Sequence, residues 1–416
     1  MSRLALSECR DCGLLQSLPE VSGPAALSCA RCDSILRRVR PSSVAQCAAC
    51  ACAGLGLFGL ALSLPMASVR MQGGRFATGD LLLGPERLAH AGASGLAVVV
   101  LITLLVMPLV RLSLVAAMAL GVTVGKTPAW LKRGFARLPS LGPWAMTEVF
   151  LLGAMIALLR LHVWMQVSYG PALLALSGVA LCSVAIDASM DRATFWRRVP
   201  LRAAVPARSQ GPLLACDHCG LVEPNADGAA CRRCGWAIHA RKPNSVKRTW
   251  ALLAAAGLLA IPANVLPVMT ITRLGRGGPS TILGGTLELI HVGMWGLALL
   301  VFVASILVPL IKLLVLSLLL LTIRRRSTAK LAQRTRLYRV VAVIGRWSLL
   351  DIFATMTLVT FARFGWLGNV LPDAGVTAFC GVAVLTMLAS EAFDPRLMWD
   401  AARKNRAVAR PEWVAS

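Results

Sequence analysis

The sequence predicts an all-α polytopic membrane protein with eight transmembrane helices, arranged as two parallel four-helix repeats, each preceded by a small cytoplasmic zinc ribbon. The 416 residues are 57% hydrophobic and only 15% charged, with a mean hydropathy of +0.69, a composition typical of integral membrane proteins. Eight apolar runs are long enough to cross a bilayer, which takes ~20 residues. Two pairs of CxxC motifs, one pair before each group of four runs, indicate an internal duplication.

The duplication divides the chain into ribbons, transmembrane repeats and a tail. We expect the first zinc ribbon at 1–44, the first repeat at 45–195, the second ribbon at 205–244, the second repeat at 245–395 and a cytoplasmic tail at 396–416. Eight of the 13 cysteines lie in the CxxC pairs on hydrophilic segments. That pattern indicates metal ligation in a reducing compartment rather than a disulfide framework.

The CxxC pairs supply two sets of four thiolates, which is the tetrahedral soft-ligand shell that Zn²⁺ prefers. A glycine follows the second cysteine of three pairs, at Gly13, Gly220 and Gly235, and permits the tight turn of such a site. The sequence therefore predicts two structural zinc ions, with iron in a rubredoxin-like site as the alternative. The ligands are Cys9, Cys12, Cys29 and Cys32 in the first ribbon and Cys216, Cys219, Cys231 and Cys234 in the second.

The apolar runs place the candidate spans at 47–69, 88–124, 143–165, 170–191, 249–271, 287–323, 346–367 and 374–393. The second and sixth runs are each 37 residues long, or roughly 55 Å as helix, which is too long for one upright span and too short for two. We expect these helices to be strongly tilted or kinked. The predicted kink sites, which include the ends of the first and fifth spans, are Pro65, Pro108, Pro267 and Pro309.

The distribution of Lys and Arg predicts the orientation of the chain. The N-terminal segment, the tail and the loops at 125–142, 192–248 and 324–345 together hold 33 of the 43 basic residues. With eight spans all these segments fall on one side, and basic loops stay in the cytoplasm. Both termini and both CxxC modules are therefore expected to be cytoplasmic. The net charge of +24 then reflects topology, and we expect no nucleic-acid partner.

Local offsets hold the two halves in register. Because each half has four spans, both halves enter the membrane from the same side, which makes a parallel repeat of the kind found in some transporters. The matched pairs include Pro108 with Pro309 and Arg111 with Lys312, each 201 residues apart, Glu148 with Asp351 at 203, and Asp187 with Asp394 at 207.

The intramembrane charges are the candidate functional residues. A lone charge at the centre of a membrane helix costs ~2.5–3.5 kcal/mol on insertion scales, so such residues face a bundle interior or a wet cavity. Arg111 and Lys312 lie inside the long runs, and Glu148 and Asp351 lie near the start of the third and seventh spans. Opposite signs in adjacent elements suggest an acid–base pair in each half, and a structural salt bridge is the alternative role for each pair.

The chain shows no nucleotide-binding loop, zinc-protease motif, nucleophile elbow or pair of catalytic carboxylates. We therefore expect no enzymatic activity. Cys47 and Cys50, at the start of the first span, form a further CxxC that has no partner pair. We expect these thiols to pack as small residues, and a membrane thiol redox protein is the alternative that would use them.

The arrangement of ribbons and spans, together with several short segments, resembles a known family. Duplicated ribbons that each precede four spans are similar to the paraquat-inducible protein A family, and the resemblance covers residues 9 to 400. Its most specific parts are the four CxxC pairs and the segments Leu64-Pro65-Met66, Leu266-Pro267-Val268, Pro309-Leu310-Ile311-Lys312-Leu313, Trp347-Ser348-Leu349-Leu350-Asp351-Ile352-Phe353 and Phe393-Asp394-Pro395-Arg396. The first half matches less well, which suggests that the second half carries the more sensitive polar site.

The resemblance implies a Gram-negative inner-membrane protein that partners a periplasmic MCE-domain protein, whose stacked rings form an apolar tunnel. The family member would move phospholipid between the bilayer and that tunnel, as a monomer within a larger complex. Lys312 and Asp351 would then form a polar floor that contacts the headgroup. The remaining alternatives are a non-transporting scaffold that anchors the tunnel and a metal sensor with exchangeable ribbon sites.

Overall fold

We describe the protein from a computed structural model, which describes residues 5–21, 23–40, 43–70, 76–162, 165–201, 212–224, 227–273, 276–361 and 368–408. Within these ranges the expected eight spans are confirmed, because eight helical stretches are long and apolar enough to cross a membrane. They are Ser43–Ser63, Ser94–Val124, Ala129–His162, Pro171–Ser189, Ser245–Val265, Trp295–Arg324, Leu331–Phe361 and Ala374–Ala392.

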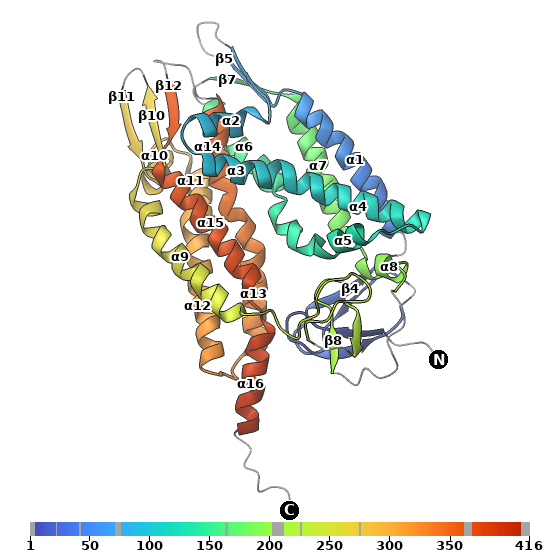
Figure 1. Ribbon diagram of the computed structural model, residues 1–416. Helices are drawn as coiled ribbons and strands as arrows, with labels where there is room; N and C mark the ends of the chain where they lie inside the picture. The colour runs from blue at the N-terminus through green and yellow to red at the C-terminus, as the bar shows by residue number, and fades with distance from the viewer. Residues whose placement is uncertain are drawn as a thin grey trace, which may run out of the picture.

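The two halves have the same order of helices (Figure 1). In the first half these are α1 (Ser43–Ser63), α4 (Met107–Val124), α5 (Ala129–Leu141), α6 (Thr147–His162), α7 (Pro171–Ser189) and α8 (Arg192–Arg197). In the second half they are α9 (Ser245–Val265), α12 (Val308–Arg324), α13 (Leu331–Ile344), α14 (Leu350–Phe361), α15 (Ala374–Ala392) and α16 (Arg396–Val408).

The second and sixth apolar runs are not single helices, which corrects the sequence-based expectation. The second run begins near the end of α2 (Leu83–His90) and continues through α3 (Ser94–Leu101) and a π-helical turn at Ile102–Val106 into α4. The sixth run likewise begins within α10 (Ile282–His291) and continues through α11 (Trp295–Phe302) and a π turn at Val303–Leu307 into α12. Gly92 and Gly293, both with φ of 84°, break the runs, since the left-handed region suits glycine.

Two of the four expected kink sites lie outside helices, which is a second correction. Pro65 follows the end of α1 and Pro267 follows the end of α9, so each ends a helix instead of bending it. Their carbonyls accept hydrogen bonds from Ala172 N (3.2 Å) and Gly375 N (2.9 Å), at the starts of α7 and α15. A proline has no N–H to donate within a helix, so Pro65 and Pro267 prevent α1 and α9 from continuing.

The other two prolines lie within continuous helical backbone. Pro108 and Pro309 are the second residues of α4 and α12, directly after the π turns. Because proline has no N–H, it leaves the carbonyl four residues earlier without its helical partner. That carbonyl lies inside the π turn in each half, which places the backbone irregularity next to the proline.

A small antiparallel sheet closes each half at the end away from the chain termini (Figure 1). In the first sheet β5 (Ala67–Arg70) lies between β6 (Phe76–Gly79) and β7 (Gln166–Tyr169). In the second, β10 (Met269–Arg273) lies between β11 (Arg276–Ser280) and β12 (Gly368–Pro372). Each sheet therefore ties the connection after the first span of its half to the connection before the last.

The halves meet through α6 and α14, which belong to the most buried spans. Phe150 and Phe353 pack edge to face with ring centroids 5.7 Å apart. Beside them, a β-carbon added at Gly153 would lie 2.8 Å from the carbonyl oxygen of Leu350. A larger side chain would separate the helices, so this glycine permits the close approach of the two halves.

The structure also corrects the register assigned to Asp187 and Asp394. The backbone N–H of Asp394 donates to Ser245 Oγ (2.9 Å), and the same hydrogen bond in the first half joins Asp191 N to Ser43 Oγ (2.7 Å). The counterpart of Asp394 is therefore Asp191, just past the end of α7, and Asp187 lies inside α7. Asp187 precedes Asp191 by four residues, which is about one helical turn. The mistaken alignment therefore still matched an acidic residue near the end of α7 with Asp394.

Candidate functional site

The first candidate site is the pair of cysteine clusters, which are built from short hairpins. The first ribbon consists of β1 (Ala5–Glu8), β2 (Leu15–Leu18), β3 (Ala25–Ser28) and β4 (Ile35–Val39), and the second of β8 (Leu213–Ala215) and β9 (Val222–Pro224). In each ribbon the four predicted ligands are buried and their sulfurs all lie within 4.8 Å of one another.

The distances between sulfurs fit a tetrahedral ion. The closest pairs are Cys9–Cys32 and Cys12–Cys29 at 3.6 Å, Cys216–Cys234 at 3.6 Å and Cys219–Cys231 at 3.5 Å. A tetrahedral centre with Zn–S bonds of about 2.3 Å has sulfurs about 3.8 Å apart. None of these cysteines forms a disulfide. Two four-thiolate clusters that can each hold a metal ion are therefore present.

The expected tight turns follow the knuckles. Gly13, Gly220 and Gly235 have φ of 69°, 75° and 79°, and their N–H groups donate to the carbonyls of Cys9, Cys216 and Cys231 at 2.8–2.9 Å. In the fourth knuckle Asp33 takes this position, with φ of 56° and a 3.0 Å bond from its N–H to Cys29 O. The sequence did not identify Asp33, although Asp tolerates this conformation better than most side chains.

The first ribbon docks mainly on the second half of the chain. Arg339 of α13 pairs with Asp11 at 3.1 Å, and Arg336 pairs with Asp33 at 2.6 Å. The guanidinium of Arg31 stacks over Trp399 of α16, 4.4 Å from the ring centroid. An ion pair between Arg37 and Asp191, at 2.8 Å, also joins this ribbon to its own half.

The second ribbon docks mainly on the first half. Trp236 Nε1 donates to the carbonyl of Arg133 at 3.1 Å, and Arg137 of α5 stacks over the same indole at 3.9 Å. Arg192 of α8 donates to the carbonyl of His218 at 3.1 Å. The ribbons therefore cross, because each one packs against helices of the half that it does not precede.

Arg396 joins both ribbons to the end of α15. This side chain is 4% exposed and bonds Asp394 (3.0 Å), Asp217 of the second ribbon (3.0 Å) and Glu8 of the first (3.5 Å). Burial raises the pKa of Asp394, but the hydrogen bond and charge of Arg396 outweigh it and hold that pKa below its usual value. Asp394 is therefore part of the ribbon attachment, outside the membrane spans.

The second candidate site is the set of intramembrane charges, and their pairing differs from the prediction. Arg111, which is 4% exposed, forms an ion pair with Asp187 of α7 rather than with Glu148. Glu148 is half-buried in the first turn of α6. Among the described residues no ion pair joins Lys312 to Asp351. The two halves therefore treat equivalent cations differently.

Lys312 is the most unusual of these residues. Its side chain is 1% exposed, and its amine has no hydrogen-bond partner among the described residues. The amine lies against the turn before α14, since a β-carbon added at Gly345 would be 3.2 Å from Nζ. A buried donor without a partner costs about 1–3 kcal/mol, so this amine is held at a cost to stability.

Three further buried hydroxyl groups belong to elements that contact α12 and α14. They are Ser305 in the π turn before α12, Ser348 in the turn before α14, and Thr355 in α14. Ser305 interacts with Asp351, whereas Ser348 and Thr355 have no hydrogen-bond partner within the described residues. At the repeat offsets their counterparts in the first half are the apolar Leu104, Ala145 and Leu152. Unsatisfied buried polar groups are rare, and a cluster of them points to water, an ion or a ligand.

Asp351 and Arg160 complete this polar cluster. Asp351, in the first turn of α14, interacts electrostatically with Arg160 of α6, which also interacts with Glu288 of α10. The structure thus places carboxylates from the second half beside a cation from the first. Among the described residues, the buried hydroxyl groups without a hydrogen-bond partner lie in the second half.

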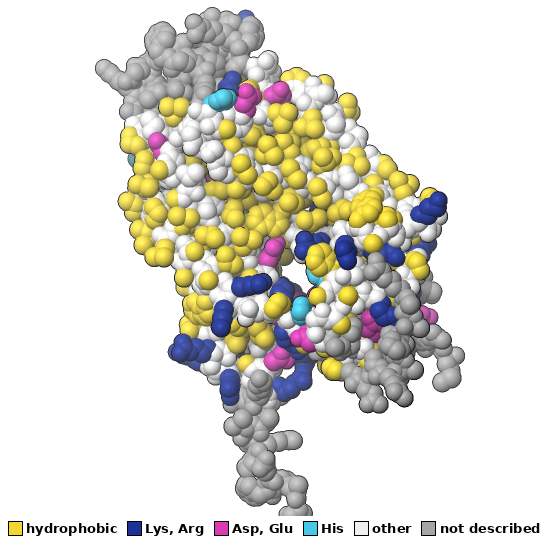
Figure 2. Space-filling view, in the orientation of Figure 1, with side chains coloured by type: hydrophobic (Ala, Val, Ile, Leu, Met, Phe, Trp, Pro, Cys, Tyr) yellow, Lys and Arg dark blue, Asp and Glu magenta, His cyan; other side chains and the backbone are white. Residues whose placement is uncertain are grey.

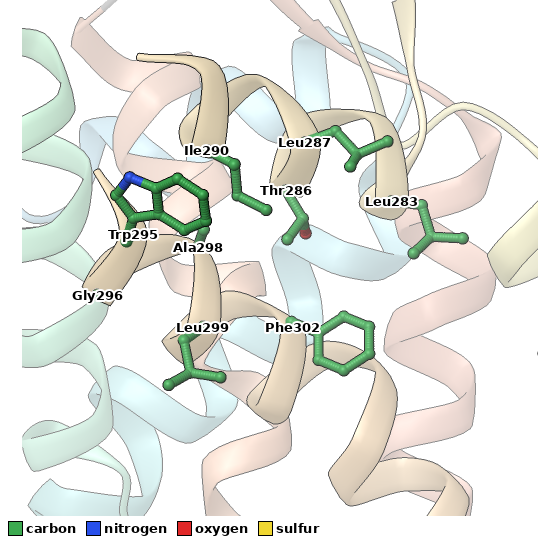
Figure 3. A pocket seen from close by; sticks show the side chains of 9 residues that line it. All are labelled: Leu283, Thr286, Leu287, Ile290, Trp295, Gly296, Ala298, Leu299 and Phe302. Atoms are coloured by element: carbon green, nitrogen blue, oxygen red, sulfur yellow. The ribbon is translucent and has the colours of Figure 1, made fainter. Parts of the chain in front are cut away.

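An apolar pocket of about 520 Å³ lies between α10 and α11. Figure 3 shows Leu287, Trp295 and Phe302 among the side chains that line it. At the repeat offset of 201, Glu86 and Ser94 stand where the second half has Leu287 and Trp295. Figure 2 shows a broad hydrophobic surface over the helices, with Lys and Arg gathered toward the ribbon end.

The additional thiols at the start of α1 do not form an accessible redox pair. Cys47 is fully buried and lies 3.6 Å from Ser189 Oγ, whereas Cys50 is half-buried and Cys52 is exposed. A redox thiol needs access to its partner. The packing role expected for Cys47 fits this environment.

The similarity to known proteins extends over both halves of the chain. A profile of the family described as Paraquat-inducible protein A matches the chain twice, at residues 44–200 and 246–403. The intermembrane transport protein PqiA of Escherichia coli (strain K12) is 31% identical over 408 residues, covering 94% of this chain and 95% of that protein. The lipophilic envelope-spanning tunnel protein A of the same strain is 29% identical over 401 residues, covering 96% and 92%. A probable intermembrane transport protein of Haemophilus influenzae is 23% identical over 407 residues, covering 94% and 95%. No solved structure matches the chain.

Proposed function

Because the chain belongs to the paraquat-inducible protein A family, we propose that it is a bacterial inner-membrane subunit that moves phospholipid between the bilayer and a periplasmic MCE-domain tunnel protein. The names of its relatives, which refer to intermembrane transport and to an envelope-spanning tunnel, support this direction. Eight apolar spans and an apolar pocket of about 520 Å³ supply surfaces that acyl chains can contact.

The proposal includes the orientation and the symmetry of the chain. Both termini and both ribbons lie in the cytoplasm, where Lys and Arg gather. The halves are parallel repeats, each capped by a ribbon with one structural zinc ion, and iron is the alternative metal. When bound, the metal fixes each ribbon as a rigid cap on the helix ends. The chain acts as a monomer within a larger complex.

The observation that carries the proposal is the polar cluster of the second half. Within the described residues, Lys312 and the hydroxyl groups of Ser348 and Thr355 are buried without partners, and Asp351 interacts with Ser305 and Arg160. The elements that carry these residues contact one another among apolar spans. A phospholipid matches this combination of groups. Its charged headgroup can hydrogen-bond to the polar side chains, and its acyl chains can pack against the apolar helices. Lys312 donates to the phosphate, and Asp351 and the hydroxyl groups position the rest of the headgroup.

The other polar residues have structural roles in this proposal. Arg111 and Asp187 form an ion pair that fastens α4 to α7. Asp394 fastens the ribbons through Arg396. Glu148 is the counterpart of Asp351 in the first half. The residues of the first half that correspond to Ser305, Ser348 and Thr355 are apolar, so Glu148 lacks the equivalent hydroxyl groups.

A reconstituted transfer assay tests the proposal. Vesicles with fluorescent phospholipid would carry this chain and its tunnel partner, and the rate of label transfer to acceptor vesicles would be measured. We expect Lys312→Ala and Asp351→Asn to slow transfer at least tenfold, with Glu148→Gln as the matched control in the first half. Transfer at the parent rate in both variants would show that the cluster has no role in lipid movement.

A further inference from the structure

A second, polar pocket lies where the two ribbons meet α8. It has a volume of about 830 Å³ and is enclosed by residues of both ribbons and of α8, as a consequence of the crossed docking. It is remote from the polar cluster in the membrane, because α8 begins beyond the end of α7. Its lining is strongly cationic, with the arginines Arg10, Arg37, Arg38, Arg192, Arg197 and Arg233.

The three carboxylates in the lining already have cationic partners. Asp191 pairs with Arg37 at 2.8 Å. Asp11 pairs with Arg339 at 3.1 Å, and Glu8 pairs with Arg241 and Arg396 at 3.4 and 3.5 Å. Five of the six arginines therefore have no carboxylate within ion-pair distance among the described residues.

Arg192 shows the resulting imbalance most clearly. Its Nη2 donates only to backbone carbonyls, of Phe135, Ala136 and His218, and its buried Nε has no partner within the described ranges. Arg233 Nε is also buried without a partner. Burial, together with the nearby positive charge of Arg10, lowers the pKa of Arg192 to about 9.

The metal centres do not remove this excess of positive charge. Four thiolates around one divalent ion carry a net charge of about −2, and Cys219 is the one metal-binding cysteine in the lining. Five arginines without carboxylates leave a surplus of about three positive charges against the second ribbon's centre alone, and of about one when both centres are counted. Guanidinium groups in such a cluster bind phosphate oxygens with paired, charge-assisted hydrogen bonds.

We propose that the pocket between the ribbons binds a phosphate-bearing anion, through Arg10, Arg192 and Arg233. The anion comes either from the headgroup of an anionic phospholipid in the adjacent leaflet or from a soluble polyphosphate. The site is distinct from the transfer site of the proposed function and does not depend on it. Its occupation would join the two ribbons, and through them the two halves of the chain.

Binding experiments with the full chain in nanodiscs separate the two sources. For the soluble source, tripolyphosphate is titrated by calorimetry in discs of phosphatidylcholine. For the lipid source, discs with phosphatidylglycerol are used, and the retained lipid is counted by native mass spectrometry. In at least one arm the parent protein binds, and Arg192→Gln weakens binding roughly tenfold or more, as expected for loss of a charged hydrogen-bond donor.

Two further variants keep the result interpretable. Arg10→Glu changes an exposed side chain, so it tests the site even if Arg192→Gln disturbs folding, and it too should weaken binding at least tenfold. Arg248→Gln removes an exposed charge at the start of α9, outside the pocket, and should leave binding unchanged. Absence of binding in both arms overturns the proposal, as does equal binding by the parent and Arg10→Glu.

Discussion

Replacing Lys312 with methionine should stabilise the protein and at the same time abolish transfer. Lys312 is 1% exposed, and its amine has no partner in the described part of the chain. Removing an unsatisfied buried donor recovers about 1–3 kcal/mol, and the unbranched methionine fits the space left by the lysine stem. The expected gain is therefore of that order.

The equivalent change in the first half gives the opposite sign. Arg111 is bonded to Asp187, whose side chain is 60% exposed, so Arg111→Met loses an ion pair worth roughly 0–1 kcal/mol. Thermal unfolding of the parent and both variants in one detergent measures the difference, and the transfer assay follows activity. If Lys312→Met unfolds below the parent temperature, or transfers lipid at the parent rate, the amine is not an unpaired functional group.

Three other predictions address the ribbons and the interface. Asp394→Asn removes one partner of a buried pair and should destabilise the protein by roughly 3–5 kcal/mol. Because the pKa of Asp394 is lowered, the stability that Asp394 contributes is fully present above its unfolded pKa and is lost as pH falls through the lower folded pKa. The difference in free energy of unfolding between the parent and Asp394→Asn should therefore stay constant from pH 8 to pH 5. A decrease of that difference within this range would contradict the assignment. Cys231→Ser should reduce bound metal from two ions per chain to one, as measured by plasma mass spectrometry, and Cys380→Ser should keep both; two ions in the first variant would rule out the predicted ligand set. Gly153→Ala should destabilise the contact between the halves by about 1–3 kcal/mol, while Gly257→Ala, which meets nothing within 4 Å, should not; equal unfolding temperatures would show that the contact is loose.

The sequence predicted the features that depend on local chemistry. Two CxxC pairs on one hydrophilic segment supply the four thiolates of a metal cluster, so all eight cysteines of the two clusters were found. Apolar length identifies a span, so the eight helices were found as well. The repeat also matched the prolines of the two halves, although Pro65 and Pro267, predicted as kink sites, lie just after the ends of α1 and α9.

The features that depend on packing between distant elements were not predicted. The pairing of Arg111 with Asp187 required knowledge of which helix faces α4, and composition does not contain it. The sequence alignment matched Asp394 with Asp187 instead of Asp191, because both aspartates lie near the end of α7 and the local sequence does not show which one is equivalent. The crossing of the ribbons joins residues as far apart as Asp33 and Arg336. The buried hydroxyl groups of the second half, however, could have been noticed in the sequence, because Ser305, Ser348 and Thr355 have apolar counterparts in the first half.

Mass spectrometry of the purified protein tests the central claim most directly, by counting bound phospholipid and metal in the parent, Lys312→Ala and Arg111→Ala. We predict two metal ions per chain in all three proteins, with phospholipid retained by the parent and by Arg111→Ala and lost from Lys312→Ala. Two metal ions with no phospholipid above the detergent background in the parent would contradict the account and would favour a scaffold that only anchors the tunnel.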